Sequence, residues 1–150
     1  EIASQMREAP SHVLLQAGVG GLAAAIAAEL RLAWGDAPQM IVVEPDVAPA
    51  LIESIRAGRV VVTEGPASAM GRLDCKTPSM LALGDLARDA DRFVTLSEAE
   101  AAAGAAAVAA HGLPSTPSGA AGVAALLAGL EGIGARSHVL CILSEEPEGA

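Results

Sequence analysis

The sequence predicts an α/β fold, with a three-layer α/β/α arrangement around a mostly parallel sheet. Two observations carry this prediction. The strand-like segments are continuous apolar runs, as parallel strands buried on both faces require. Strand-like and helix-like segments also alternate along the chain, in the order β-α-β-α-β-α-β-α-α-β. The 150 residues are enough for one domain with a core, and their one Phe, one Trp and absent Tyr predict that this core is aliphatic.

The first half of the chain contains three predicted strands and two helices. Residues 12–17 form an apolar run that stops at a cluster of glycines, and the Ala- and Leu-rich residues 21–33 then predict a helix that ends near Gly35. Residues 39–44 (Gln-Met-Ile-Val-Val-Glu) predict a second buried strand. A helix over 49–57 is closed by Gly58, and residues 59–63 predict a third strand.

The second half begins with a Gly-, Pro- and Ser-containing loop over 65–78, followed by a helix over 79–87 and a strand over 92–96. Ser97 and Glu100 form a capping-box pattern that starts a helix running to about His111. A loop over 114–119, a helix over 120–130 and an apolar strand over 137–143 complete the pattern. The end segments 1–8 and 145–150 are typical of cuts through a longer protein.

Composition excludes several classes of partner. The net charge is −9 and Lys76 is the only lysine, so no basic patch is available for nucleic acid or an anionic membrane. The apolar stretch 101–110 is too short to span a bilayer, and no signal peptide is visible. Cys75 and Cys141 lack metal-ligand spacing and are expected to be buried thiols in a reducing compartment. These features predict a cytoplasmic protein.

The glycine cluster matches the G-x-G-x-x-[GA] pattern of a phosphate-binding loop between a strand and a helix, over residues 18–23. Glu44 ends the next strand, 24 positions after Gly20, which is near the spacing of a carboxylate that holds ribose hydroxyls. An NAD-binding module is therefore one hypothesis. A non-catalytic scaffold domain and a glycine turn without ligand are others. No hydride-transfer constellation follows, because His111 and His138 have no obvious carboxylate partner in sequence.

Several stretches occur in an order that carries a family resemblance. They are His-Val-Leu-Leu-Gln-Ala-Gly-Val-Gly-Gly-Leu-Ala (12–23), Ile-Val-Val-Glu-Pro-Asp (41–46), Met-Gly-Arg-Leu-Asp-Cys-Lys-Thr-Pro-Ser (70–79), Pro-Ser-Gly-Ala-Ala-Gly (117–122) and Val-Leu-Cys-Ile-Leu-Ser-Glu (139–145). Together they resemble the C-terminal half of the diaminopropionate ammonia-lyases, which are pyridoxal-phosphate (PLP) enzymes of fold type II, in the tryptophan synthase β superfamily. The resemblance runs over nearly the whole chain.

This resemblance implies PLP as the cofactor and α,β-elimination of 2,3-diaminopropionate to pyruvate and ammonia as the reaction. A threonine or serine dehydratase-like activity is the alternative within the superfamily. The hydroxyl of Ser144 would meet the pyridine nitrogen and leave it largely unprotonated. The 5′-phosphate would be held by the backbone of five loop residues: Ala17, Gly18, Val19, Gly20 and Gly21.

The resemblance also implies that parts of the active site are missing. The Schiff-base lysine of the family lies upstream of the glycine loop, in a region this chain lacks, so no catalytic residue is assigned here. Lys76 is expected to be a solvated loop lysine. Some relatives bind a divalent cation through the Glu of Glu-Pro and an acid six residues later; that position is Ala50 here, so no metal is expected and Glu44 would cap the following turn.

The chain is therefore interpreted as one partial PLP-binding domain over 1–150, inactive alone, from a carbon–nitrogen lyase that acts on a small amino acid. A truncated sheet leaves an exposed edge and an uncovered apolar face. We expect self-association through them, as a homo-oligomer, with a dimer as the simplest case.

Overall fold

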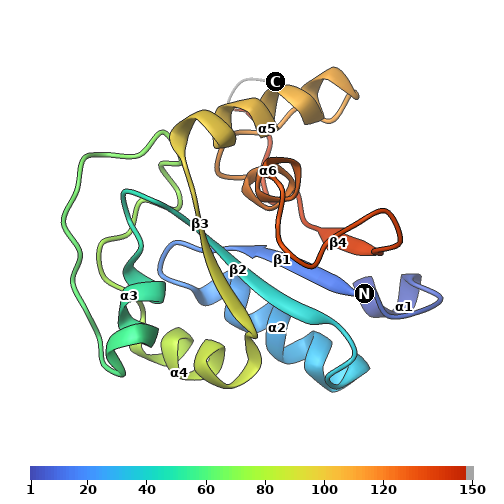
Figure 1. The fold of residues 1–150 in the computed structure, drawn as a ribbon, viewed down its shortest axis with the longest axis horizontal. Helices are drawn as coiled ribbons and strands as arrows, with labels where there is room; N and C mark the ends of the chain where they lie inside the picture. Colours follow the sequence, from blue (N-terminus) through green and yellow to red (C-terminus); the bar gives the residue numbers. More distant parts are fainter. Residues whose placement is uncertain (148–150) are drawn as a thin grey trace.

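Four parallel strands form the centre of the molecule in the computed structural model, which describes residues 1–147 (Figure 1). They are β1 (His12–Gln16), β2 (Gln39–Pro45), β3 (Arg92–Leu96) and β4 (Val139–Cys141). Their order in the sheet is β3-β2-β1-β4, and every neighbouring pair is parallel. His12 lies opposite Gln39 on one side and Val139 on the other, so strands from the two ends of the chain meet at β1.

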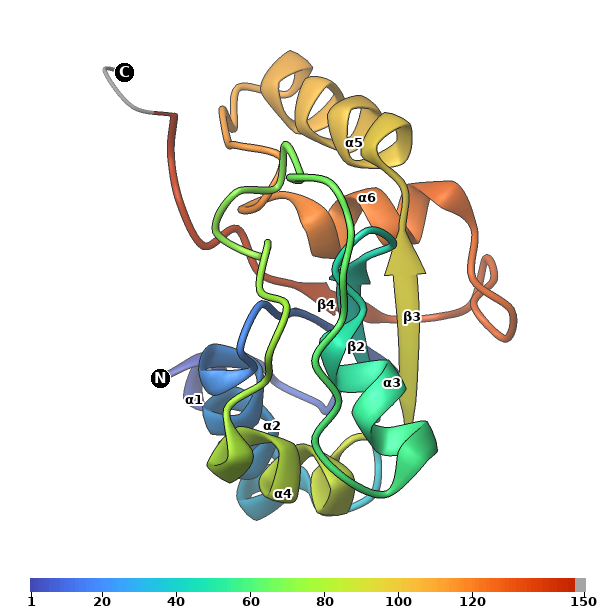
Figure 2. The same cartoon turned by 90° about the vertical axis from the view of Figure 1, so that its left-hand side faces the viewer.

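Helices cover both faces of this sheet, which confirms the predicted α/β/α layers. On one face lie α2 (Gly21–Trp34), α3 (Ala50–Ala57) and α4 (Met80–Asp89), and on the other lie α5 (Glu98–Ala110) and α6 (Ala121–Ala128). Figures 1 and 2 show the two groups on opposite sides of the strands. A short α1 (Ile2–Gln5) precedes β1, in one of the two end segments.

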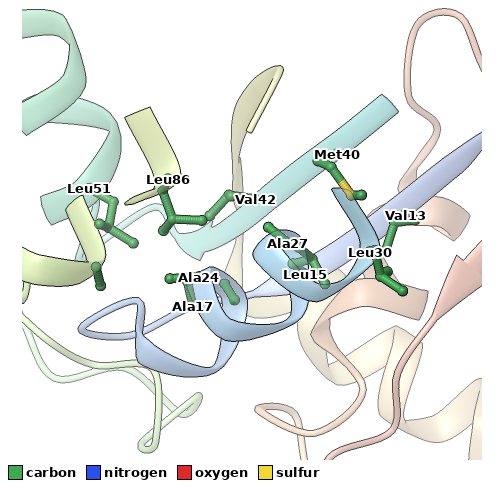
Figure 3. Packing of buried hydrophobic residues seen from close by; sticks show 12 residues of the cluster. Val13, Leu15, Ala17, Ala24, Ala27, Leu30, Met40, Val42, Leu51 and Leu86 are labelled. Atoms are coloured by element: carbon green, nitrogen blue, oxygen red, sulfur yellow. The ribbon is translucent and has the colours of Figure 1, made fainter. Parts of the chain in front are cut away.

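Alternate residues of each strand enter the two halves of the core. Val13 and Leu15 of β1 pack toward α2, α3 and α4, as Figure 3 shows, whereas Leu14 packs toward α5 and α6. The strands are buried on both faces, which explains their continuous apolar sequences. The core is aliphatic as predicted: Ala, Val, Leu, Ile and Met make up its fully buried members, and Phe93 is only partly buried at its margin.

The predicted strand at 59–63 is wrong. This segment lies in the irregular connection between α3 and α4, and 67% of Val62 is exposed. The Thr63 N–H bonds to the carbonyl of Lys76 at 2.8 Å, in the same connection. β2 already pairs with β1 on one side and β3 on the other, so the segment that follows α3 finds no place beside it. Its β-branched residues have strand propensity but no partner strand.

Most other predicted bounds agree with the structure to within a few residues. The capping box at the start of α5 is present, because Ser97 accepts from the Glu100 N–H and the Glu100 side chain accepts from the Ser97 N–H. The last strand is shorter than predicted and ends at Cys141. The acidic end segment is described as far as Pro147, and residues 148–150 lie outside the described residues.

Candidate functional site

A cavity of about 440 Å³ lies where β1 ends and α2 begins. In a parallel sheet, ligands bind at this carboxyl edge of the strands. The structure brings together around the cavity all the residues that the sequence proposed for cofactor binding. They are Ala17, Gly18, Val19, Gly20, Gly21 and Ser144.

The loop between β1 and α2 presents backbone donors to this cavity. The last sheet bond of β1 runs from the Ala17 N–H to the carbonyl of Val43, at 2.9 Å. Gly20 then turns the chain with φ of 99°, a left-handed conformation that favours glycine, and α2 begins at Gly21. Within residues 1–147, the N–H groups of 18–22 donate to no protein acceptor. Such N–H groups at a helix N-terminus are suited to an anion.

The three glycines of the loop have different surroundings. A Cβ on Gly18 would come within 2.9 Å of the Arg72 carbonyl oxygen and of the Cys75 Sγ. A Cβ on Gly20 would meet the Ala82 side chain at 3.1 Å. A Cβ on Gly21 would have nothing within 4 Å. Gly18 and Gly20 are therefore required by packing and backbone conformation, whereas Gly21 faces open space beside the cavity.

Ser144 reaches the cavity from the chain that continues beyond β4, and Gln16 holds it there. The Gln16 side chain is 3% exposed, and its Nε2 donates to Ser144 Oγ at 3.0 Å. The same nitrogen donates to the carbonyls of Ile142 at 2.8 Å and Gly119 at 3.1 Å. One amide thus joins the end of β1, the extension of β4 and the loop before α6. Sequence reasoning missed Gln16, although a single polar residue in an apolar strand is a usable signal.

The remaining wall of the cavity comes from the loop before α4 and from Glu145. The Arg72 N–H donates to Ser118 Oγ at 3.2 Å, and Arg72 Nε lies 3.0 Å from Glu145 Oε2. Glu145 Oε1 accepts from Thr116 Oγ1 at 2.6 Å. Sequence reasoning gave Arg72 and Glu145 no role, because their pairing joins segments more than 70 residues apart.

Glu44 lies outside the cavity lining and is 1% exposed. Its Oε1 accepts from the Leu51 N–H at 2.7 Å and its Oε2 from the Ile52 N–H at 2.8 Å, at the start of α3. The interpretation of Glu44 as a cap of the following turn is confirmed. The dinucleotide hypothesis is wrong at this residue, because a carboxylate with both oxygens inside the core has no free edge for ribose hydroxyls.

Burial raises the pKa of Glu44 to about 7, although the two backbone N–H donors act in the opposite direction. The folded state therefore holds a proton that the unfolded state releases at lower pH. This contribution to stability is present below about pH 4.5 and is lost as the pH rises to about 7.

We expect Glu44→Gln to remove this pH dependence. The free energy of unfolding of the parent, followed by urea denaturation, should fall relative to the variant by at most about 1.4 kcal/mol per pH unit between pH 5 and 7. Equal slopes in the two proteins would contradict the assignment to Glu44. The variant should also be less stable at every pH, because an amide can accept only one of the two N–H bonds.

The expectation of a solvated Lys76 is wrong. Its ammonium donates to the carbonyls of Val47 at 2.8 Å and Pro66 at 2.9 Å, and to Asp74 Oδ1 at 2.6 Å. The lysine pairing also holds the pKa of Asp74 below its usual range. Lys76 therefore fastens the long connection before α4 to the turn after β2, and it does not line the cavity.

The two cysteines are free and half-buried rather than fully buried. Cys75 lines the cavity beside Gly18, and burial raises the pKa of Cys141 to about 11. In the described part of the chain, no three His, Cys, Asp or Glu side chains gather as a metal site would require. None of the helices within residues 1–147 combines the length and apolar character needed to cross a bilayer.

The cavity therefore offers N–H donors for an anion at one end and a hydroxyl, fixed by a buried amide, at the other. This donor set fits a compact ligand that carries a phosphate and a polar ring atom. The packed Gly18 and Gly20 leave no room for side chains over the loop, as a close approach of a ligand to the backbone requires.

Comparison with known proteins points to the same chemistry. Residues 1–145 match the family model described as "Pyridoxal-phosphate dependent enzyme". The diaminopropionate ammonia-lyase of Escherichia coli (strain K12) is 37% identical over 111 residues, which cover 69% of this chain and 27% of that protein. The chain thus spans about a quarter of the length of this curated relative.

Solved structures share the fold. Diaminopropionate ammonia lyase from Escherichia coli, in complex with an aminoacrylate-PLP azomethine reaction intermediate, is 28% identical with a TM-score of 0.83, over 97% of this chain and 41% of that one. A threonine deaminase from the organism abbreviated T.th. is 25% identical with a TM-score of 0.80, over 93% of this chain and 50% of that one.

Proposed function

This chain belongs to the family of pyridoxal-phosphate dependent enzymes, and from that premise we propose that the cavity between β1, α2 and Ser144 holds PLP. The observation that carries the proposal is the set of backbone N–H groups over 18–22, which face the cavity without protein acceptors in the described part of the chain. They would hold the 5′-phosphate, and Ser144 would meet the ring nitrogen.

Bound PLP supplies an electron-accepting ring that stabilises negative charge on the α-carbon of an amino acid. The residues of this chain would bind and orient it. The loop Ala17–Gly21 anchors the phosphate at the N-terminus of α2, where the helix dipole favours negative charge. Gln16 holds the Ser144 hydroxyl at the opposite end of the cavity. The ion pair of Arg72 and Glu145 closes one wall.

We propose that the full-length protein is a carbon–nitrogen lyase that converts 2,3-diaminopropionate and water to pyruvate and two molecules of ammonia. The 37% identity to a diaminopropionate ammonia-lyase supports this substrate. A threonine or serine dehydratase-like activity is the second candidate, supported by the 25% identity to a threonine deaminase. Ammonia release from each of the three amino acids distinguishes them, and a preference for threonine or serine would overturn the first assignment.

Other parts of the proposal concern the rest of the protein. We propose that this chain is part of one PLP-binding domain and that the Schiff-base lysine comes from outside residues 1–150, so that the chain alone has no turnover. The negative charge and single lysine support a small amino-acid substrate rather than a nucleic acid or membrane partner. A homodimer in the cytoplasm is proposed for the full-length protein.

The lysine assignment has a direct test. Borohydride reduction of the full-length protein loaded with PLP should give a stable adduct on a lysine outside residues 1–150, identified by peptide mass spectrometry. Lys76 should carry none, because its ammonium is bound by three oxygens away from the cavity. The variant Lys76→Met should keep the adduct, and a PLP adduct on Lys76 in the parent would overturn the assignment.

A further inference from the structure

We propose that Gln16 is a positioning residue that makes the Ser144 hydroxyl a hydrogen-bond donor toward the ligand, so that the ring nitrogen of PLP is bound unprotonated. This inference rests on the proposed function, in which that nitrogen faces Ser144. Gln16 would not touch the cofactor's reacting atoms and would act through Ser144.

The surroundings of Gln16 fix the orientation of its amide. Its Nε2 lies 2.8 Å from the carbonyl oxygen of Ile142 and 3.1 Å from that of Gly119, and carbonyl oxygens can only accept. The flipped amide would bring Oε1 against both of them. The nitrogen must therefore face these carbonyls, and Ser144 Oγ, which is 3.0 Å from the same nitrogen, must be its acceptor.

This arrangement biases the hydroxyl of Ser144. An amide nitrogen has no lone pair to accept with, so the hydroxyl hydrogen cannot point at Gln16. Within residues 1–147 no protein acceptor receives that hydrogen. A hydroxyl that accepts one hydrogen bond also becomes a stronger donor. The hydrogen is thus available to the cavity, where a lone pair on an aromatic nitrogen is the matching acceptor.

The amide also directs partial positive charge at this end of the cavity, which disfavours a protonated ring. The charged side chains that line the cavity, Arg72 and Glu145, pair with each other at 3.0 Å, and Cys75 is the further titratable group in its wall. The Gln16 amide is therefore the polar group that contacts Ser144 directly and sets its orientation.

Gln16 holds this position at a cost to folding. Its Oε1 is buried and has no hydrogen-bond partner in the described part of the chain. The space beside it depends on Gly122, because a Cβ there would come within 3.3 Å of Oε1. A buried polar atom without a partner is expected where a side chain is retained for position rather than for stability.

The test follows the ring nitrogen directly. Full-length protein is loaded with PLP carrying ¹⁵N in the ring, and the ¹⁵N chemical shift is recorded as a function of pH. In the parent the nitrogen should stay unprotonated through the neutral range. Gln16→Met, which keeps the length but removes the donor, should raise the pKa of the nitrogen by about one unit, a tenfold change in its protonation equilibrium.

Ser144→Ala is the matched second variant, and it does not depend on core packing because Ser144 is exposed. It should raise the pKa of the nitrogen as well, and adding Gln16→Met to it should have no further effect, since Gln16 acts through Ser144. A purely structural role would lower the melting temperature of Gln16→Met and leave the protonation of the nitrogen unchanged.

Failure of the inference and failure of the proposed function give different results. PLP that binds the parent with a protonated nitrogen, or a nitrogen pKa that is the same in parent and Gln16→Met, overturns the role of Gln16 alone. A parent protein that does not bind PLP at all overturns the proposed function and this inference with it.

Discussion

Replacing Gly21 by Asp is expected to weaken PLP binding at least about 100-fold. Gly21 is exposed at the first position of α2, and a side chain there enters open space beside the cavity. A carboxylate at this position would lie close to a phosphate held by the loop. Two like charges a few ångströms apart near a protein surface repel by about 3–4 kcal/mol, which corresponds to a factor of 100 or more in affinity.

Gly21→Asn is the matched control, because Asn has the shape of Asp without its charge. It should weaken binding by less than about tenfold, and both variants should unfold at nearly the same denaturant concentration as the parent. Titration of each full-length protein with PLP, followed by absorbance, gives the three dissociation constants. Equal affinities for Asp and Asn at this position would show that the phosphate binds elsewhere.

Gly20 is unsuitable for this comparison. Its φ of 99° and its contacts with Ala82, Leu86 and Leu51 mean that any side chain there would disturb the fold. A loss of PLP binding in Gly20→Asp would therefore report on folding as much as on charge.

Replacing Gly104 by Ala is expected to destabilise the protein by about 3 kcal/mol, although Ala is the better helix former. Gly104 lies in α5, where it packs against α6. A Cβ on it would overlap the Ala124 side chain and come within 2.6 Å of the Ala124 Cα. The two helices would have to move apart, which would loosen the packing of Ala101 and Ala121 beneath them. Urea denaturation of parent and variant measures the difference.

Gly84→Ala provides the matched control in α4. A Cβ on Gly84 would meet nothing within 4 Å, so only helix propensity and the entropy of the unfolded chain change. This variant should gain about 0.5–1 kcal/mol of stability. A loss in Gly84→Ala similar to that in Gly104→Ala would show that close approach of α5 to α6 is not the cause.

Local patterns were sufficient for the layers and for the glycine loop. The runs at β1, β2 and β3 are buried on both faces, and continuous apolar sequence is the direct consequence of that environment. Capping at Ser97 and the left-handed Gly20 likewise depend on a few neighbouring residues. Residues 59–63 have the same local propensity as a strand, yet they remain unpaired because sheet membership depends on which edge is free.

The amino-acid sequence alone thus established the α/β architecture, the aliphatic core and the loop 17–21, because each depends on periodicity or backbone freedom within a short window. The chemistry of the opposite end of the cavity required the folded chain. Gln16 and Ser144 are 128 residues apart, and they meet because β1 and β4 pair in one register. The burial of Glu44, the three bonds of Lys76 and the pairing of Arg72 with Glu145 are also contacts between separate segments, which no local pattern encodes.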